Sequence, residues 1–155
     1  MNKQELIDRI CEVLPQDEKI LSPAELIGSI LDAVPLLCTK LKDNLFVGTE
    51  PESPVDATTL YDTGGPNSQD AFNAIDTVGV QVRVRSKSYR SGWQLISEIK
   101  TSLQSIPGVE FNKQCIVGLW VESPPMLIGK DGQSNSLFTM NLRLMVTSEH
   151  TGHRA

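Results

Sequence analysis

The sequence is poor in the residues that most catalytic and metal-binding sites require. Its 155 residues include two histidines and three cysteines, which are His150, His153, Cys11, Cys38 and Cys115. The cysteines are odd in number, widely spaced and without a Cys-x-x-Cys pair, so they indicate neither a disulfide framework nor a zinc site, and we expect reduced thiols. Both histidines fall in residues 149–155, which lack apolar anchors and are expected to form a flexible tail. The sequence therefore predicts no metal site.

Signature motifs of the common enzyme classes are absent as well. The chain has no Gly-x-x-x-x-Gly-Lys phosphate loop, no His-Glu-x-x-His zinc helix, no Gly-x-Ser-x-Gly elbow and no Gly-x-Gly-x-x-Gly fingerprint. Its acidic residues are spread over expected helix surfaces and loops, so no carboxylate is placed by the pattern for general acid-base work. We expect a protein that is not an enzyme and binds no cofactor.

Long hydrophobic runs and positive charge are scarce too. No apolar run approaches the roughly 18 residues that suggest a membrane span, and residues 1–10 indicate an amphipathic helix, not a signal peptide. We expect a soluble, non-secreted protein without a membrane partner. The net charge of -5 argues against specific nucleic-acid binding, which depends on excess Lys and Arg. The charge is uneven, because residues 1–76 hold 5 basic and 14 acidic side chains, whereas residues 77–155 hold 9 and 5.

The composition is that of a globular protein, with 39% hydrophobic and 21% charged residues. The first secondary-structure elements that the sequence predicts are helices. Apolar residues at helical spacing precede Pro15, namely Leu6, Ile7, Ile10, Cys11, Val13 and Leu14. A second helix starts where Ser22 provides a cap hydroxyl, Pro23 a first-turn proline and Glu25 a capping-box carboxylate. Pro35 ends or kinks this helix, since it lacks a backbone donor.

Strand patterns dominate the rest of the chain. Val78, Val80, Val82 and Val84 alternate with Gly79, Gln81, Arg83 and Arg85, which predicts a strand with one face on a core. Further strands are expected at 45–47, 58–61, 115–121, 126–128 and 137–147, with a hairpin turn at Lys130-Asp131-Gly132. A helix is expected from 88 to 106, its core stripe formed by Trp93, Ile96, Ile99, Leu103 and Ile106 and its end marked by Pro107-Gly108.

These elements predict an α+β fold. It would contain a mostly antiparallel sheet of about four to five strands packed by helices, with an N-terminal helical segment. We expect a single domain over residues 1–155, divided into N-terminal helices in 1–42, an α/β core in 43–148 and the flexible tail in 149–155.

One tripeptide suggests catalysis. Asp62-Thr63-Gly64 follows two apolar residues, as in the loop of aspartic proteases. Such enzymes need two carboxylates that share a proton, so a single copy would have to dimerise about the loop. Gly65 and Pro66 follow at once, which favours a turn in which the Asp62 side chain caps its own backbone. The protease remains a minor alternative.

Two surface features are candidate contact sites. Arg83, Arg85, Lys87 and Arg90 form the one concentrated charge cluster, and few aromatic residues accompany it, so a protein partner or plain solvation is favoured over nucleic acid. In the hairpin from Pro124 to Leu137, the apolar residues Met126, Leu127 and Ile128 precede a polar turn, and an apolar segment on a projecting hairpin can form contact surface.

The order of these pieces resembles a bacteriophage minor-capsid family related to tail terminators. The resemblance is carried by two N-terminal helices, Phe46-Val47-Gly48-Thr49-Glu50-Pro51, Tyr61-Asp62-Thr63-Gly64-Gly65, Val80-Gln81-Val82-Arg83-Val84-Arg85 before a helix, and the final hairpin. It spans roughly Leu45 to Val146. It implies a structural virion protein of the tail or neck, assembled in the bacterial host cytoplasm, that forms a ring, commonly a hexamer, on the tail tube, stops tube growth and faces the head-tail connector.

A ring agrees with the uneven charge. A closed ring joins unlike patches of neighbouring subunits, so the acidic half of one copy would meet the Arg83, Arg85 and Lys87 cluster of the next. The alternative within the same machinery is a head-tail connector or stopper subunit of the phage neck, and a host-protein binding module is a third possibility.

Overall fold

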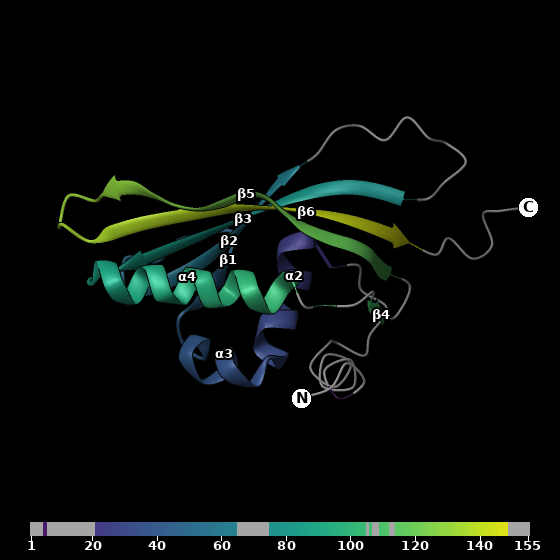
Figure 1. The fold of residues 1–155 in the computed structure, drawn as a ribbon, viewed down its shortest axis with the longest axis horizontal. Coiled ribbons are helices and arrows are strands. Elements are labelled where there is room, and N and C mark those ends of the chain that lie inside the picture. Colours follow the sequence, from purple (N-terminus) through teal and green to yellow (C-terminus); the bar gives the residue numbers. More distant parts are fainter. Residues whose placement is uncertain are drawn as a thin grey trace, which may run out of the picture.

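A computed structural model describes Glu5 and residues 21–64, 75–104, 106, 109–111 and 114–148. In these parts of the chain, helices lie on one side of a six-stranded sheet (Figure 1). The helices are α2 (Pro23–Ala33), α3 (Pro35–Leu41) and α4 (Tyr89–Gln104). The strands are β1 (Leu45–Val47), β2 (Ala57–Gly64), β3 (Ile75–Ser86), β4 (Val109–Phe111), β5 (Gln114–Lys130) and β6 (Ser136–Ser148).

The sheet confirms the α+β prediction and adds detail that the sequence does not carry. Its strand order is β1-β2-β3-β6-β5-β4. β1 pairs with β2 in parallel and the other neighbours are antiparallel, so the sheet is mixed although mostly antiparallel. β4 was not predicted. β5 was predicted as two strands, but it is continuous, because a register shift between Ser123 and Met126 accommodates Pro124 and Pro125.

The start of α2 follows the predicted capping box. The Ser22 hydroxyl accepts from the Glu25 backbone amide at 3.2 Å, and the Glu25 carboxylate accepts from the Ser22 amide at 3.0 Å. Pro35 separates α2 from α3 and stands in the first turn of α3, where its missing N–H costs no hydrogen bond. Leu37 and Leu41 continue the buried apolar stripe into α3.

The core lies between the helices and one face of the sheet. Val80, Val82 and Val84 of β3 are fully buried and pair with Leu142, Met140 and Phe138 of β6. Ile96, Ile99 and Leu103 of α4 pack over them. Trp93 was predicted to belong to this stripe, and that prediction was wrong: its side chain is partly exposed, because Gly92 rather than Trp93 faces Phe138 at the point of closest approach.

Several sequence predictions fall outside the residues that the structure describes. They are the N-terminal helix before Pro15, of which Glu5 alone is described, the polar segment after Gly64, the Pro107-Gly108 stop signal and the tail at 149–155 with its two histidines.

Candidate assembly surface

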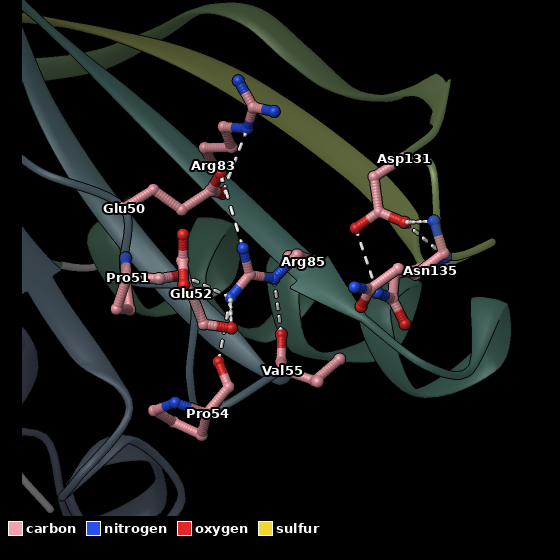
Figure 2. Close-up of polar contacts among 10 residues, drawn as sticks. Glu50, Pro51, Glu52, Pro54, Val55, Arg83, Arg85, Asp131 and Asn135 are labelled. Carbon is pink, nitrogen blue, oxygen red and sulfur yellow. Dashed lines mark hydrogen bonds and ion pairs between the residues drawn. The ribbon is translucent and has the colours of Figure 1, made fainter.

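The Arg85 guanidinium is bound by groups of its own subunit. The residue is only 9% exposed, and its guanidinium is covered by the segment from Glu50 to Val55 (Figure 2). Its Nε donates to the Val55 carbonyl at 2.7 Å, and its Nη2 donates to the Pro51 and Pro54 carbonyls at 2.6 and 2.9 Å. Several donors of one planar group therefore bind backbone carbonyls of the same segment. Arg85 holds this segment on the uncovered face of the sheet.

Arg83 lies beside Arg85 and shares its acidic neighbour. Arg83 Nε is 3.2 Å from Glu50 Oε1, and Arg85 Nη1 is 3.6 Å from Glu50 Oε2. The Arg83 and Glu50 atoms are misaligned for a hydrogen bond, so the contact is an ion pair. The acidic half of the sequence thus meets the basic cluster within one subunit at this point. An intersubunit role for Arg83 and Arg85 stays a prediction.

Lys87 and Arg90 are the exposed members of the cluster. Lys87 directly follows the end of β3, and Arg90 is the second residue of α4. The Lys87 backbone amide donates to Asp56 at 3.0 Å, but neither side chain has an ion-pair partner among the described residues. These two cations are therefore the part of the cluster available to a partner.

The Asp62-Thr63-Gly64 tripeptide forms the end of β2 rather than a turn. Asp62 Oδ1 accepts a hydrogen bond from the Ala24 backbone amide at 2.8 Å, in the first turn of α2. Among the described residues the Asp62 carboxylate thus caps a helix that is distant in sequence and not its own backbone, and Gly65 and Pro66 of the predicted turn lie outside these residues. This position suits an anion, because the first backbone amides of a helix lack acceptors and carry partial positive charge.

The β5–β6 hairpin at one end of the sheet, residues 123–141, is named the arm; it is part of the sheet, because β6 also pairs with β3 there, from Ser136 with Ser86 to Asn141 with Gln81. Its turn lies beyond the N-terminal end of α4 (Figure 1). Met126, Leu127 and Ile128 on this arm are 54%, 43% and 47% exposed. Leu127 pairs with Phe138, whose side chain faces the helices, whereas Met126 pairs with Thr139 on the opposite face. The arm therefore presents apolar surface on both faces, and a contact role for Met126, Leu127 and Ile128 stays a prediction.

The turn at the tip of the arm is ordered by Asp131. Its Oδ1 accepts from the Gln133 and Asn135 amides at 2.8 and 3.0 Å, and its Oδ2 accepts from Asn135 Nδ2 at 2.9 Å (Figure 2). The side-chain and backbone hydrogen bonds from Asn135 lower the pKa of the Asp131 carboxyl. The tip therefore carries a fixed negative charge at neutral pH.

A groove runs between α3 and α4. Its volume is about 480 Å³, and its lining includes Leu36, Arg90, Trp93, Gln94, Ser97 and Thr101. Leu36 is 57% and Trp93 39% exposed. The Trp93 and Tyr89 rings both contact Phe138, with centroids 6.1 and 5.6 Å away. Sequence reasoning missed this groove, because helical spacing alone placed Trp93 in the core and left Leu36 unassigned.

A second, polar cavity of about 330 Å³ lies between α4 and β2. Its charged lining includes Lys40 and Glu98, which form an ion pair at 2.7 Å. Thr58 is among its lining residues, and within the described part of the chain the Thr58 Oγ1 has no hydrogen-bond partner. Among the described residues, no group of three or more His, Cys, Asp or Glu side chains is placed to hold a metal ion, and no helix has the length and apolarity to span a bilayer.

Comparison with known proteins identifies one family. A family model described as bacteriophage tail terminator protein matches residues 21–148, from the start of α2 to the end of β6. No curated protein matches the chain.

Proposed function

The chain belongs to the bacteriophage tail terminator family, and on this premise we propose that it forms a ring that caps the tail tube and joins the tube to the head-tail connector. Family membership makes the chain a structural protein of the phage tail and a component of the virion. The ring, its stoichiometry and its two partners are the proposed part.

The observation that carries the proposal is the family match over the whole described α+β fold. The surface of the subunit supports it. A ring needs two unlike patches that meet between neighbours. The arm supplies one apolar patch, on β5 at the end of the sheet, and the exposed cations Lys87 and Arg90 with the nearby groove supply a different one.

The predicted interface residues divide into two roles under this proposal. Lys87, Arg90 and the apolar residues Met126, Leu127 and Ile128 contact other subunits or tail proteins. Arg83 and Arg85 act indirectly, because they hold the Glu50–Val55 segment that covers part of the open sheet face. An acidic subunit around the DNA passage also reduces adhesion of the genome as it slides through.

The test is assembly of the cognate tail tube protein with and without the purified chain. We expect tubes that stop at a defined length and carry a ring at one end in negative-stain images. Tubes that grow without limit in its presence, with no added density at either end, would contradict the terminator function. Binding to the head connector without any effect on tubes would instead favour the connector or stopper alternative.

A further inference from the structure

We propose, on the basis of the ring assembly above, that neighbouring subunits are joined edge to edge, with β5 of one copy paired to β1 of a second copy. The paired segments are residues 119–121 of β5 and the whole of β1, Leu45–Val47. The six-stranded sheet then continues from one subunit into the next, and its two edges are the unlike patches of a heterologous contact.

Both edges of the sheet are open in the described part of the chain. β5 is the longest strand, but on its outer side β4 pairs only with Gln114, Cys115 and Ile116. β1 stands at the opposite end of the sheet and pairs with β2 alone. The outer sides of β1 and of the rest of β5 therefore present backbone N–H and C=O groups, and a further strand is the occupant that satisfies such groups.

The two open runs agree in length. β5 pairs regularly with β6 from Gly118 to Val121, and register shifts interrupt the ladder on both sides of this run. Pro124 and Pro125, which have no N–H to donate, follow it. Bulges and prolines of this kind protect the remainder of the edge from strand addition. A partner strand thus has the space of residues 118–121, and β1 is a strand of three residues.

The side chains of β1 are apolar on both faces of the sheet. Val47 pairs with the core residue Leu60, so Leu45 and Val47 share the face that the helices cover. Phe46 lies between them and faces the uncovered side. Val47 is 43% exposed, and Leu45 and Phe46 are partly exposed. The edge at β1 therefore leaves apolar surface in water on both faces.

The open run of β5 repeats this pattern. Leu119 and Val121 pair with core residues of β6, so they face the helices. Trp120 lies between them on the uncovered face and is 43% exposed. Joining the two edges with the helices on the same side brings the aliphatic residues together beside the core and places Trp120 against Phe46. Aromatic and aliphatic pairs directly across two strands are the contacts that stabilise a sheet.

Strand direction fixes the sense of the joint. β1 runs parallel to β2, and three antiparallel pairings, β2–β3, β3–β6 and β6–β5, lead from β2 to β5. β5 therefore runs opposite to β1. In a ring whose axis lies along the strands, every copy has the same strand direction, so the joint is antiparallel. Its central pair is Trp120 with Phe46, flanked by Leu119 with Val47 and by Val121 with Leu45.

The occupant of each edge is a second copy, because one subunit cannot bring its own edges together. β2, β3 and β6 lie between β1 and β5, and they separate the two edges by four strand spacings, roughly 19 Å. The aliphatic and aromatic pattern of each open run is matched by the other edge of the same chain. The arm continues β5 beyond the open run, so Met126, Leu127 and Ile128 border the joint.

Paired charge substitutions test the joint in the full chain. Phe46→Lys with Trp120→Lys places like charges across it, and Phe46→Glu with Trp120→Lys places opposite charges there. Lysine is used at position 120 because Arg143 lies opposite Trp120 on β6 and would neutralise a carboxylate. Light scattering should show that the like-charged variant stays a monomer at concentrations about tenfold above those at which the wild type assembles, whereas the opposite-charge variant assembles. Gln81→Lys, in the middle of the same face, is the matched control that should assemble as the wild type does.

Rescue by opposite charges can arise only between molecules, since positions 46 and 120 lie at opposite edges of the sheet. Salt should weaken the assembly of this variant more than that of the wild type, because it screens the introduced pair. Trp120→Lys alone is a check that does not depend on Phe46. Because Trp120 is exposed, this variant should unfold at the wild-type urea concentration and still need about tenfold more protein to assemble.

Three outcomes would contradict the edge pairing. Assembly of the like-charged variant or of Trp120→Lys as in the wild type, or a folded opposite-charge variant that assembles no better than the like-charged one, would overturn it and leave the terminator function standing. A wild type that stays a monomer in solution but loses tube binding on Trp120→Lys would assign the β5 edge to the tail tube protein and overturn the pairing between copies. A wild-type chain that assembles neither alone nor on tubes would overturn the ring and the edge pairing together.

Discussion

Gly92 on α4 lies directly against the ring of Phe138 on β6. A Cβ added at Gly92 would stand 2.5 Å from Phe138 Cε2 and 2.9 Å from Ser86 Cβ. Phe138 is fully buried, and Tyr89 and Trp93 contact its ring on either side of Gly92. This contact sets how closely α4 approaches the sheet, and it turns Tyr89 and Trp93 outward. The exposed aromatic surface beside the groove is thus a consequence of one residue without a side chain.

Gly92→Ala should destabilise the protein. The gain in helix propensity is about 1 kcal/mol, but the added methyl overpacks a rigid ring in the core, which costs roughly 1–3 kcal/mol. We expect a net loss of stability in urea unfolding. Gly28→Ala in α2 is the matched control, because its Cβ would approach no atom closer than 3.6 Å. That variant should gain about 1 kcal/mol, and equal effects of the two changes would contradict the packing argument.

Asp62→Ala should cost about 0.5–2 kcal/mol, since it removes a helix cap from α2. Asp62→Asn keeps an acceptor oxygen and should lose less. Urea denaturation measures both. The control is Asp76→Ala at an exposed position of β3, which should change stability by less than about 0.5 kcal/mol. If Asp62→Asn abolished a hydrolytic activity of the pure protein while stability was unchanged, the aspartic protease alternative would return.

Arg85→Lys should loosen the Glu50–Val55 segment. Lysine has three donors on a single atom and cannot reproduce the planar contacts to the Pro51, Pro54 and Val55 carbonyls. The carbonyls left without a partner should cost roughly 1–3 kcal/mol. Limited proteolysis should then cut this segment faster. Arg83→Lys, at a more exposed ion pair with Glu50, should cost no more than about 1 kcal/mol. Equal cleavage rates for the two variants would refute the role of Arg85.

The Asp131 turn should respond to pH in a defined direction. Because the pKa of Asp131 is lowered in the folded state, its contribution to stability is complete above the unfolded-state pKa and is lost as the pH falls through the folded-state pKa. Asn135→Ala removes the largest cause and should raise the pKa of Asp131 toward its ordinary value, as measured by NMR titration of the carboxyl carbon. A pKa of Asp131 that does not change in this variant would show that the Asn135 side chain does not stabilise the charge.

The local elements of this protein follow from its sequence. The capping box at Ser22 and Glu25, the valine alternation of β3 and the hairpin at Asp131 depend on residues close in the chain, so their periodicity and turn chemistry suffice to predict them. The order of such pieces was also enough to indicate the family that the match over residues 21–148 establishes.

Tertiary structure decided which polar and aromatic side chains are engaged within the subunit and which are exposed at its surface. Arg83, Arg85, Lys87 and Arg90 form one cluster in sequence, but the fold brings the Glu50–Val55 segment over Arg85 and leaves Arg90 in a groove. Asp62 looks like part of a turn until α2 places the Ala24 amide beside it. Trp93 has the spacing of a core residue until Gly92 meets Phe138. Each outcome depends on contacts between segments distant in the chain, and a local pattern carries no information about such contacts.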